Sequence, residues 1–229
     1  MAKNVIMALA DCDAVILAGG QGTRIRHLLP RSWPKCMAGV NGAPFVDILI
    51  AHLRPRFRRL LFAAGYGWLI LNGYFAVKYG SNDWLITLIE REPLGTAGAI
   101  LNACNSISSD PFFVFNADTW TDFDLESMAE CHVQTNGLAT VAVDGEMRHC
   151  GVFVFSKKIF EVMRKMDRPF STEDLFTELG GRHETVNFYY VERPEFYDIG
   201  TPSGLSEFKA YWSKKPFSLE RDHGSMPQS

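Results

Sequence analysis

The sequence has few of the features that mark exported or membrane-spanning proteins. No apolar run reaches the roughly 18 residues that a membrane helix needs, and the apolar stretch 5–10 stops at Asp11, which is too short for a secretory signal. The five cysteines are an odd number, widely spaced, and form no C-x-x-C pair. This argues against a disulfide framework and suits a reducing compartment. We therefore expect a cytoplasmic protein without a membrane partner.

An excess of basic charge is also missing. The 229 residues carry a net charge of −3 and the pI is near 6.1, so there is no electrostatic footprint for sequence-independent nucleic-acid binding. Hydrophobic residues make up 47% and charged residues 21% of the chain, which excludes wholesale disorder. This length fits one large domain better than two small ones.

Short apolar runs alternate with longer amphipathic stretches along the chain. The runs predicted as strands are 14–17, 60–63, 85–89, 112–115, 139–143 and 152–155. The stretches predicted as helices are 45–53, 98–104, 125–133 and 159–166. Several strands are apolar at every position, which is typical of strands buried on both faces. The alternation predicts an α/β fold with a mostly parallel sheet flanked by helices, in which ligands bind at the carboxyl ends of the strands.

A glycine-rich loop follows the first predicted strand. Gly19, Gly20 and Gly22 allow positive φ and let backbone N–H groups approach an anion, while Thr23 and Arg24 offer a hydroxyl and a guanidinium. The spacing is neither the dinucleotide fingerprint nor the P-loop pattern. The alternative interpretation is a tight turn with an exposed arginine. The same connection ends at Lys35, which is suited to stabilising charge on a transferring phosphoryl group.

Two further segments follow later strands. Gly95 and Gly98 lie in the segment 92–100, whose glycines let the backbone pass close to a flat ring and ribose at a helix N-terminus. A helix simply capped by Thr96 is the plainer explanation. The fourth strand runs into Asp118, where a carboxylate beside a phosphate site suits Mg²⁺, although an aspartate there can also cap a turn.

Taken together, these segments resemble the sugar-1-phosphate nucleotidyltransferases, also called nucleotide-sugar pyrophosphorylases. The motif L-A-G-G-x-G-T-R is followed about ten residues later by P-K, and E-P-L-G-T-A-G, N-x-D and D-I-G-T-P come after it. The chain is most similar to the compact bacterial members that activate D-glycero-D-manno-heptose 1-phosphate or mannose 1-phosphate. The resemblance covers about 15–212. It implies one Rossmann-like domain of the nucleotide-diphospho-sugar transferase type over 13–212, with an N-terminal extension 1–12 and a loose tail 213–229.

The resemblance also implies roles for individual residues. The catalytic residues would be Arg24, Lys35 and Asp118. The nucleotide would be bound by Leu17, Ala18, Gly19, Gly20, Gly22, Thr23, Arg24, Glu92, Pro93, Gly95, Thr96 and Gly98. The substrate would contact Asn116, Gly151 and Glu173, and Asp118 and Asp198 would bind Mg²⁺, with Thr201 capping the last helix and Pro202 at its first position. The implied reaction joins a nucleoside triphosphate, with GTP favoured, to a sugar 1-phosphate and releases pyrophosphate, for surface polysaccharide synthesis.

The sequence departs from the family where relatives bind the sugar. Relatives carry a Glu-Lys pair ahead of N-[AG]-G-[IV]-Y, whereas this chain has no such pair and places His149 and Cys150 before Gly151. Glu173 is equally interpreted as a first-turn glutamate of a helix capped by Ser171. These differences leave open a cytidylyl- or uridylyltransferase acting on another phosphorylated acceptor, and a catalytically silent nucleotide-sugar-binding regulator. The base, the acceptor and any homo-oligomer are not readable from the motifs.

Two other groups of residues have plainer interpretations. Cys131-His132 and His149-Cys150 do not form natural two-ligand zinc units, because adjacent strand residues point to opposite faces. A cluster of arginines, Arg54, Arg56, Arg58 and Arg59, is expected to form a solvated helix end and strand start, with a partner-binding patch as the alternative.

Overall fold

The computed structural model describes residues 8–192 and 195–215. The predicted extension and tail therefore lie largely outside the described residues, at 1–7 and 216–229. Within the part that is described, no helix is long and apolar enough to cross a bilayer.

The central feature is a seven-stranded sheet in the order β10-β8-β9-β6-β1-β4-β5. Its strands are β1 (Asp13–Leu17), β4 (Arg59–Ala64), β5 (Leu85–Ile89), β6 (Phe112–Asn116), β8 (Ala139–Val143), β9 (His149–Phe155) and β10 (Val186–Tyr190). Only β9 runs antiparallel to its neighbours, β6 and β8. All six predicted strands are present and the mostly parallel sheet is confirmed.

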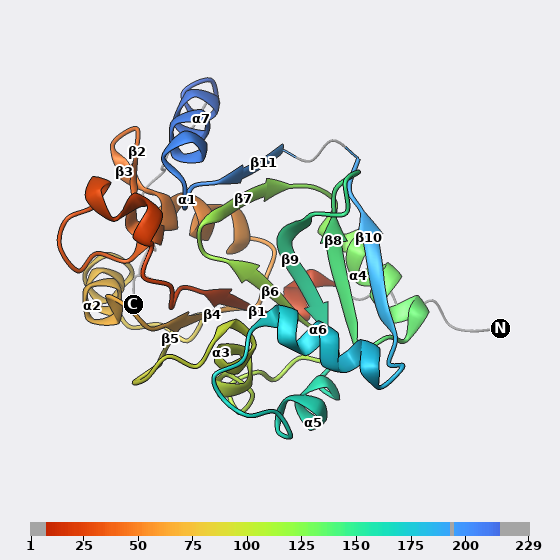
Figure 1. The fold of residues 1–229 in the computed structure, drawn as a ribbon. Helices are drawn as coiled ribbons and strands as arrows, with labels where there is room; N and C mark the ends of the chain where they lie inside the picture. Colours follow the sequence, from red (N-terminus) through yellow and green to blue (C-terminus); the bar gives the residue numbers. More distant parts are fainter. Residues whose placement is uncertain (1–7, 193–194, 216–229) are drawn as a thin grey trace, which may run out of the picture.

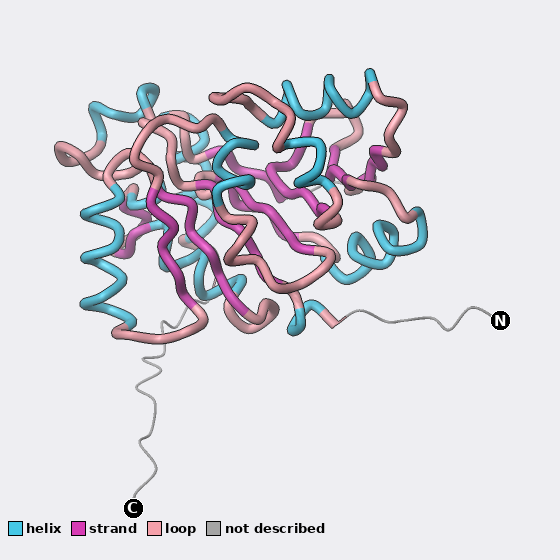
Figure 2. The backbone as a smooth tube through the Cα atoms, turned by 90° about the horizontal axis from the view of Figure 1, so that it is seen from below, coloured by secondary structure: helices cyan, strands magenta, loops and turns pink. Residues whose placement is uncertain are grey.

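Helices cover both faces of this sheet (Figures 1 and 2). The helices are α1 (Phe45–Leu53), α2 (Trp68–Tyr79), α3 (Thr96–Asn102), α4 (Leu125–Thr135), α5 (Ile159–Met163), α6 (Thr172–Gly181) and α7 (Pro202–Trp212). Short 3-10 helices span Leu9–Asp11, Thr23–Leu28 and Lys35–Met37. Two short antiparallel sheets pair β2 (Gly39–Val40) with β3 (Ala43–Pro44) and β7 (Thr119–Asp122) with β11 (Glu195–Asp198).

The alternation of side chains along the strands separates two hydrophobic cores. In β1, Ala14 and Ile16 face the core formed with α1, α2 and α4, whereas Val15 and Leu17 face the core formed with α3, α5 and α6. Figure 1 shows α3, α5 and α6 grouped together on one side of the strands. Both faces of the central strands are therefore apolar, which is why these strands read as continuous apolar runs in the sequence.

A buried ion pair that the sequence did not indicate lies at the amino-terminal ends of β1 and β4, away from the ligand-binding ends of the strands. From the sequence, Arg59 is expected to be solvated. Instead, its guanidinium donates two hydrogen bonds to the carboxylate of the fully buried Asp13, at 2.9 and 2.7 Å. Burial would raise the pKa of Asp13, but the Arg59 guanidinium and the N–H groups of Ser108 and Ser109 outweigh it and lower the pKa to about 2. The prediction was wrong for Arg59 because its partner lies 46 residues away.

Candidate active site

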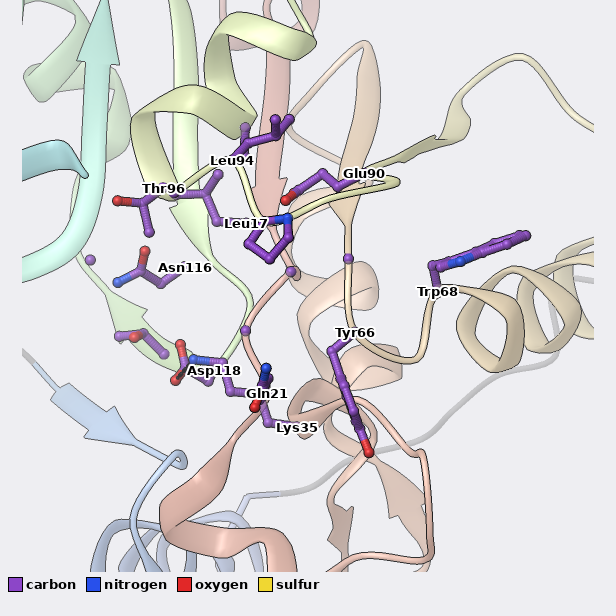
Figure 3. A pocket seen from close by; sticks show the side chains of 18 of the residues that line it. Leu17, Gln21, Lys35, Tyr66, Trp68, Glu90, Leu94, Thr96, Asn116 and Asp118 are labelled. Atoms are coloured by element: carbon purple, nitrogen blue, oxygen red, sulfur yellow. Dashed lines mark hydrogen bonds and ion pairs between the residues drawn. The ribbon is translucent and has the colours of Figure 1, made fainter. Parts of the chain in front are cut away.

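A pocket of about 880 Å³ opens at the carboxyl ends of β1, β4, β5 and β6. Its walls are the segments that directly follow those strands, and Figure 3 shows their side chains converging from different elements. The pocket lies where ligands bind in open sheets of this type. The predicted site is therefore one continuous cavity rather than several separate surfaces.

The glycine loop after β1 forms the floor of this pocket and holds Lys35. Gly22 adopts a left-handed φ of 63°, and a Cβ on it would stand 2.8 Å from the Cβ of Lys35. A Cβ on Gly20 would be 3.3 Å from the Cε of the same lysine. In the described part of the chain, no backbone N–H from 19 to 22 finds an acceptor. The loop thus presents free donors and a cation together, as an anion site requires.

Lys35 forms an ion pair with Asp118, which follows β6. The Asp118 side chain is only 8% exposed and that of Lys35 is 20% exposed. A carboxylate at this depth needs a cation partner because the loss of its hydration is costly. The pair therefore brings together two predicted catalytic residues that lie 83 positions apart.

Asp198 meets Asp118 through the pairing of β7 with β11. Asp198 lies opposite Thr119 in the antiparallel register, and the N–H of Ile199 donates to the Asp118 carbonyl at 2.9 Å. Both carboxylates converge on Gly200, where a Cβ would stand 2.7 Å from Asp118 Oδ2 and 2.8 Å from Asp198 Oδ1.

Arg24 completes this group of charges from the glycine loop. Its Nη2 lies 3.4 Å from Asp198 Oδ2, and its side chain is 62% exposed. Because the guanidinium is open to solvent, the pair itself adds little stability. Arg24 is available to bind an anionic ligand entering the pocket.

The two aspartates fit a divalent metal ion that also binds a ligand. Among the described residues no group of three or more His, Cys, Asp or Glu side chains is positioned to hold a metal ion. However, Mg²⁺ takes hard oxygen ligands, keeps several waters and is commonly bound by one or two carboxylates together with substrate phosphates. The convergence of the Asp118 and Asp198 oxygens on Gly200 matches that donor set.

The segment after β5 wraps the opposite side of the pocket. Gly95 has φ of 76° and approaches Phe170 so closely that a Cβ would stand 2.3 Å from its carbonyl oxygen. Helix α3 begins at Thr96 with Gly95 as its N-cap. The alternative of a Thr96 cap is therefore wrong, because the Thr96 hydroxyl instead accepts a hydrogen bond from the Thr172 N–H at 2.8 Å.

Asn116 and Gly151 meet where β6 pairs with β9. Gly151 has φ of 69°, and a Cβ on it would be 3.1 Å from both Asn116 Nδ2 and Thr119 Oγ1. A side chain at position 151 would therefore crowd this wall of the pocket.

Glu173 lines a second cavity of about 410 Å³ instead of the main pocket. His149 borders both cavities. Glu173 lies in the first turn of α6, which Ser171 caps in a capping box with Asp174, so the helix-capping interpretation of this segment is confirmed. The second cavity is largely apolar and includes Phe153 and Phe176.

Most of the residues predicted for the site line the main pocket. They are Leu17, Gly19, Gly20, Arg24, Lys35, Glu92, Pro93, Gly95, Thr96, Asn116, Asp118, Gly151 and Asp198. Ala18, Gly22, Thr23 and Gly98 are not in its lining. Gly98 instead donates its N–H to the Phe170 carbonyl at 3.2 Å.

Sequence reasoning missed other lining residues. They include Gln21, Gly65, Tyr66, Trp68, Glu90, Arg91, Leu94, Thr119, His149 and Phe196. Gly65 and Glu90 come directly after β4 and β5. The rule that ligands bind beyond strand ends was therefore sufficient to find them.

Comparison with known proteins identifies a family and individual relatives to which this chain is similar. A family model described as MobA-like NTP transferase domain matches residues 14–183. A D-glycero-alpha-D-manno-heptose 1-phosphate guanylyltransferase from Campylobacter jejuni is 32% identical over 51% of this chain and 52% of its own length. The chain thus spans about half of that relative. The enzyme of the same description from Aneurinibacillus thermoaerophilus is 27% identical over 83% of this chain and 94% of its own length.

A solved structure has the same fold. HddC from Yersinia pseudotuberculosis, complexed with GMP-PN, superposes with a TM-score of 0.73 at 26% identity, covering 88% of this chain and 99% of that one. The fold comparison thus extends over nearly the whole of that chain.

Proposed function

The chain belongs to the MobA-like NTP transferase family, and we propose that it is a sugar-1-phosphate nucleotidyltransferase that joins GTP to a heptose or mannose 1-phosphate with release of pyrophosphate. The observation that carries the proposal is the convergence of Lys35, Asp118, Asp198 and Arg24 beside a glycine loop with free N–H groups.

The reaction is an in-line attack by a sugar 1-phosphate oxygen on the α-phosphorus of the nucleoside triphosphate, with pyrophosphate as the leaving group. The nucleophile is already an anion, so no strong general base is needed. The protein's task is to bring two polyanions together and to stabilise negative charge as it moves. No side chain has to act as a covalent nucleophile.

The residues of the pocket divide this task. The N–H groups of the glycine loop and the guanidinium of Arg24 bind the triphosphate. Lys35 neutralises charge at the phosphate that is transferred. Asp118 and Asp198 would hold Mg²⁺, which supplies a Lewis acid and a template for the phosphates when bound. Asp118 also orients Lys35 through their ion pair.

The ribose and base of the nucleotide bind beside the segment after β5. The sugar 1-phosphate binds on the side formed by Asn116 and Gly151. Glu92 and Pro93 border the pocket there, and the left-handed turn at Gly95 shapes that wall. On the sugar side, His149 borders both the main pocket and the second cavity. Although the Glu-Lys segment is missing, the second cavity therefore gives the sugar 1-phosphate acceptor additional apolar space.

We also place the reaction in the cytoplasm, as one step in the synthesis of a surface polysaccharide. All five cysteines are free thiols, which is consistent with a reducing compartment. The heptose and mannose guanylyltransferases among the relatives support the biosynthetic setting.

The experiment that tests the function measures pyrophosphate release with Mg²⁺, using each of the four nucleoside triphosphates against a panel of sugar 1-phosphates. We expect release with GTP and one sugar. Release with CTP or UTP instead would support the cytidylyl- or uridylyltransferase alternative. Tight nucleotide-sugar binding without release from any pair would contradict catalysis and support a regulatory protein.

A further inference from the structure

The ammonium group of Lys35 is bound to the Asp118 oxygen that faces Asp198. Lys35 Nζ pairs with Asp118 Oδ2. The same Oδ2 would stand 2.7 Å from a Cβ on Gly200, and Asp198 Oδ1 would stand 2.8 Å from that Cβ. The oxygen through which Asp118 can share a cation with Asp198 is therefore already bound to a cation of the protein itself.

The second carboxylate is engaged in a similar way. Asp198 Oδ1 accepts the Gly200 N–H at 2.8 Å, and Asp198 Oδ2 lies 3.4 Å from Arg24 Nη2. Arg24 Nη2 would also stand 3.3 Å from a Cβ on Gly200. The two carboxylates are thus matched by two cations, and these four side chains together carry no net charge. A divalent cation that arrives alone gains little from such a group, because the attraction of the carboxylates is offset by the repulsion of the two cations.

Lys35 lies where a short movement exchanges one partner for another. Its Cε would stand 3.3 Å and its Nζ 3.5 Å from a Cβ on Gly20, so the ammonium group is beside the glycine loop whose N–H groups are free. Figure 3 shows Lys35 next to Asp118 at this side of the pocket. The lysine stem is flexible and its ammonium group accepts partners from several directions. A phosphate held by the loop can therefore take the ammonium group away from Asp118.

Asp118 needs a replacement when Lys35 leaves. Its side chain is only 8% exposed, and an ionised carboxylate at that depth is costly without a cation beside it. The position between Asp118 and Asp198 is then open to a divalent ion, which takes carboxylate and phosphate oxygens together. Movement of Lys35 to a phosphate and entry of a metal ion are therefore favourable together, whereas each is unfavourable alone.

We propose that Lys35 occupies the cation position of the empty pocket and leaves it when the nucleotide binds, so that Mg²⁺ and the triphosphate bind together. The proposal rests on the proposed function for the placement of the triphosphate and of the metal ion. Lys35 has Asp118 as its partner in the empty pocket and a phosphate as its partner in the loaded one. Coupling of this kind is reciprocal: the triphosphate strengthens metal binding by the same factor as the metal strengthens triphosphate binding.

The first test measures the binding of Mg²⁺ alone, by titration calorimetry on the full chain without nucleotide. Lys35→Met removes the charge, and Lys35→Gln also removes it but keeps an N–H donor for Asp118. Both variants should bind Mg²⁺ at least about tenfold more tightly than the wild type, within the usual 5- to 150-fold range of coupling between sites. The matched control Lys165→Met removes an exposed lysine outside the pocket lining and should bind Mg²⁺ as the wild type does. Thermal melting identifies the variants that are folded.

The second test measures the binding of GTP in EDTA, where no metal ion can replace Lys35 at Asp118. Asp118→Asn should bind GTP more tightly than the wild type, because Lys35 then leaves no buried carboxylate behind. Loss of a negative charge near the phosphates also favours GTP, so the same substitution is made in Lys35→Met. Simple repulsion gives the same gain in both backgrounds. Exchange of Lys35 makes the gain at least about threefold larger when Lys35 is present, as expected for two residues in contact.

Unchanged Mg²⁺ affinity in the folded Lys35 variants, or equal gains for Asp118→Asn in the two backgrounds, would overturn the proposal. Pyrophosphate release by the wild type, measured with GTP, Mg²⁺ and the sugar 1-phosphate panel, tests the proposed function separately. Tighter Mg²⁺ binding by the Lys35 variants without any release by the wild type would uphold the exchange and contradict the enzyme. Release by the wild type with unchanged Mg²⁺ affinity in the variants would uphold the enzyme and overturn the exchange.

Discussion

Replacing Asp118 by asparagine tests the centre of the proposed site. The substitution keeps the size and shape of the side chain but removes the negative charge that pairs with Lys35. It also removes one of the two carboxylates that converge on Gly200. The substitution should therefore lower both the turnover and the free energy of unfolding, by different amounts.

The stability effect follows from the depth of the ion pair. Removing one partner of a fully buried pair costs about 3–5 kcal/mol, because a charge is left uncompensated. Lys35 remains 20% exposed at the wall of an open pocket, so water recovers part of this loss and we expect a cost of about 1–2 kcal/mol. For a chain of this length that corresponds to a fall in Tm of roughly 2–8 °C, which leaves a folded protein to assay.

The effect on turnover should be larger. Loss of a single group that stabilises charge in a transition state costs on the order of 10²-fold in kcat, or about 2.7 kcal/mol at 1.36 kcal/mol per tenfold. Asp118→Asn should lose at least this much in pyrophosphate release with Mg²⁺. The control Asp122→Asn changes an exposed aspartate at the end of β7, and it should keep wild-type turnover.

The double variant with Asp198→Asn makes the test stricter. If both carboxylates act through one bound cation, the second substitution should add much less than its own single effect. Turnover of Asp118→Asn within about threefold of the wild type would refute the assignment. Fully additive losses would show that the two aspartates act separately.

Three further predictions concern neighbouring features. Gly200→Ala should reduce pyrophosphate release at least about tenfold and lower Tm by no more than Asp118→Asn does, because its Cβ would displace both carboxylates; unchanged release would contradict their convergence. Thr201→Ala should lower the free energy of unfolding by about 1 kcal/mol in urea titrations, because the Thr201 hydroxyl accepts the Gly204 N–H at 3.1 Å and caps α7; an unchanged midpoint would show that this cap is not needed. Burial lowers the pKa of His132 from 6.5 to about 4. As the pH falls below 6.5, this histidine therefore takes up a proton in the unfolded chain before it does so in the folded one, and the wild type should lose stability between pH 6.5 and 4. The His132→Gln variant should therefore lose about 2 kcal/mol less than the wild type between pH 7.5 and 5 in urea unfolding, and equal losses would contradict a neutral His132.

The sequence was most informative where burial makes strands apolar on both faces. The run 112–115 is recognisable because Phe112 and Phe113 enter different cores. β10 was missed because it is an edge strand whose Phe188 and Tyr190 are 48% and 63% exposed. α2 was missed for a related reason: Leu69 and Val77 face solvent, so its apolar residues do not form a single stripe.

The motifs identified most of the pocket, but they did not show how its parts are joined. Asp118 and Asp198 meet only because β7 and β11 pair in one register, and neither strand carries an apolar run that predicts the pairing. Arg59 was assigned to solvent for the same reason, since Asp13 reaches it across β1 and β4. Local patterns identify the groups that handle charge, whereas their partners depend on contacts between distant strands.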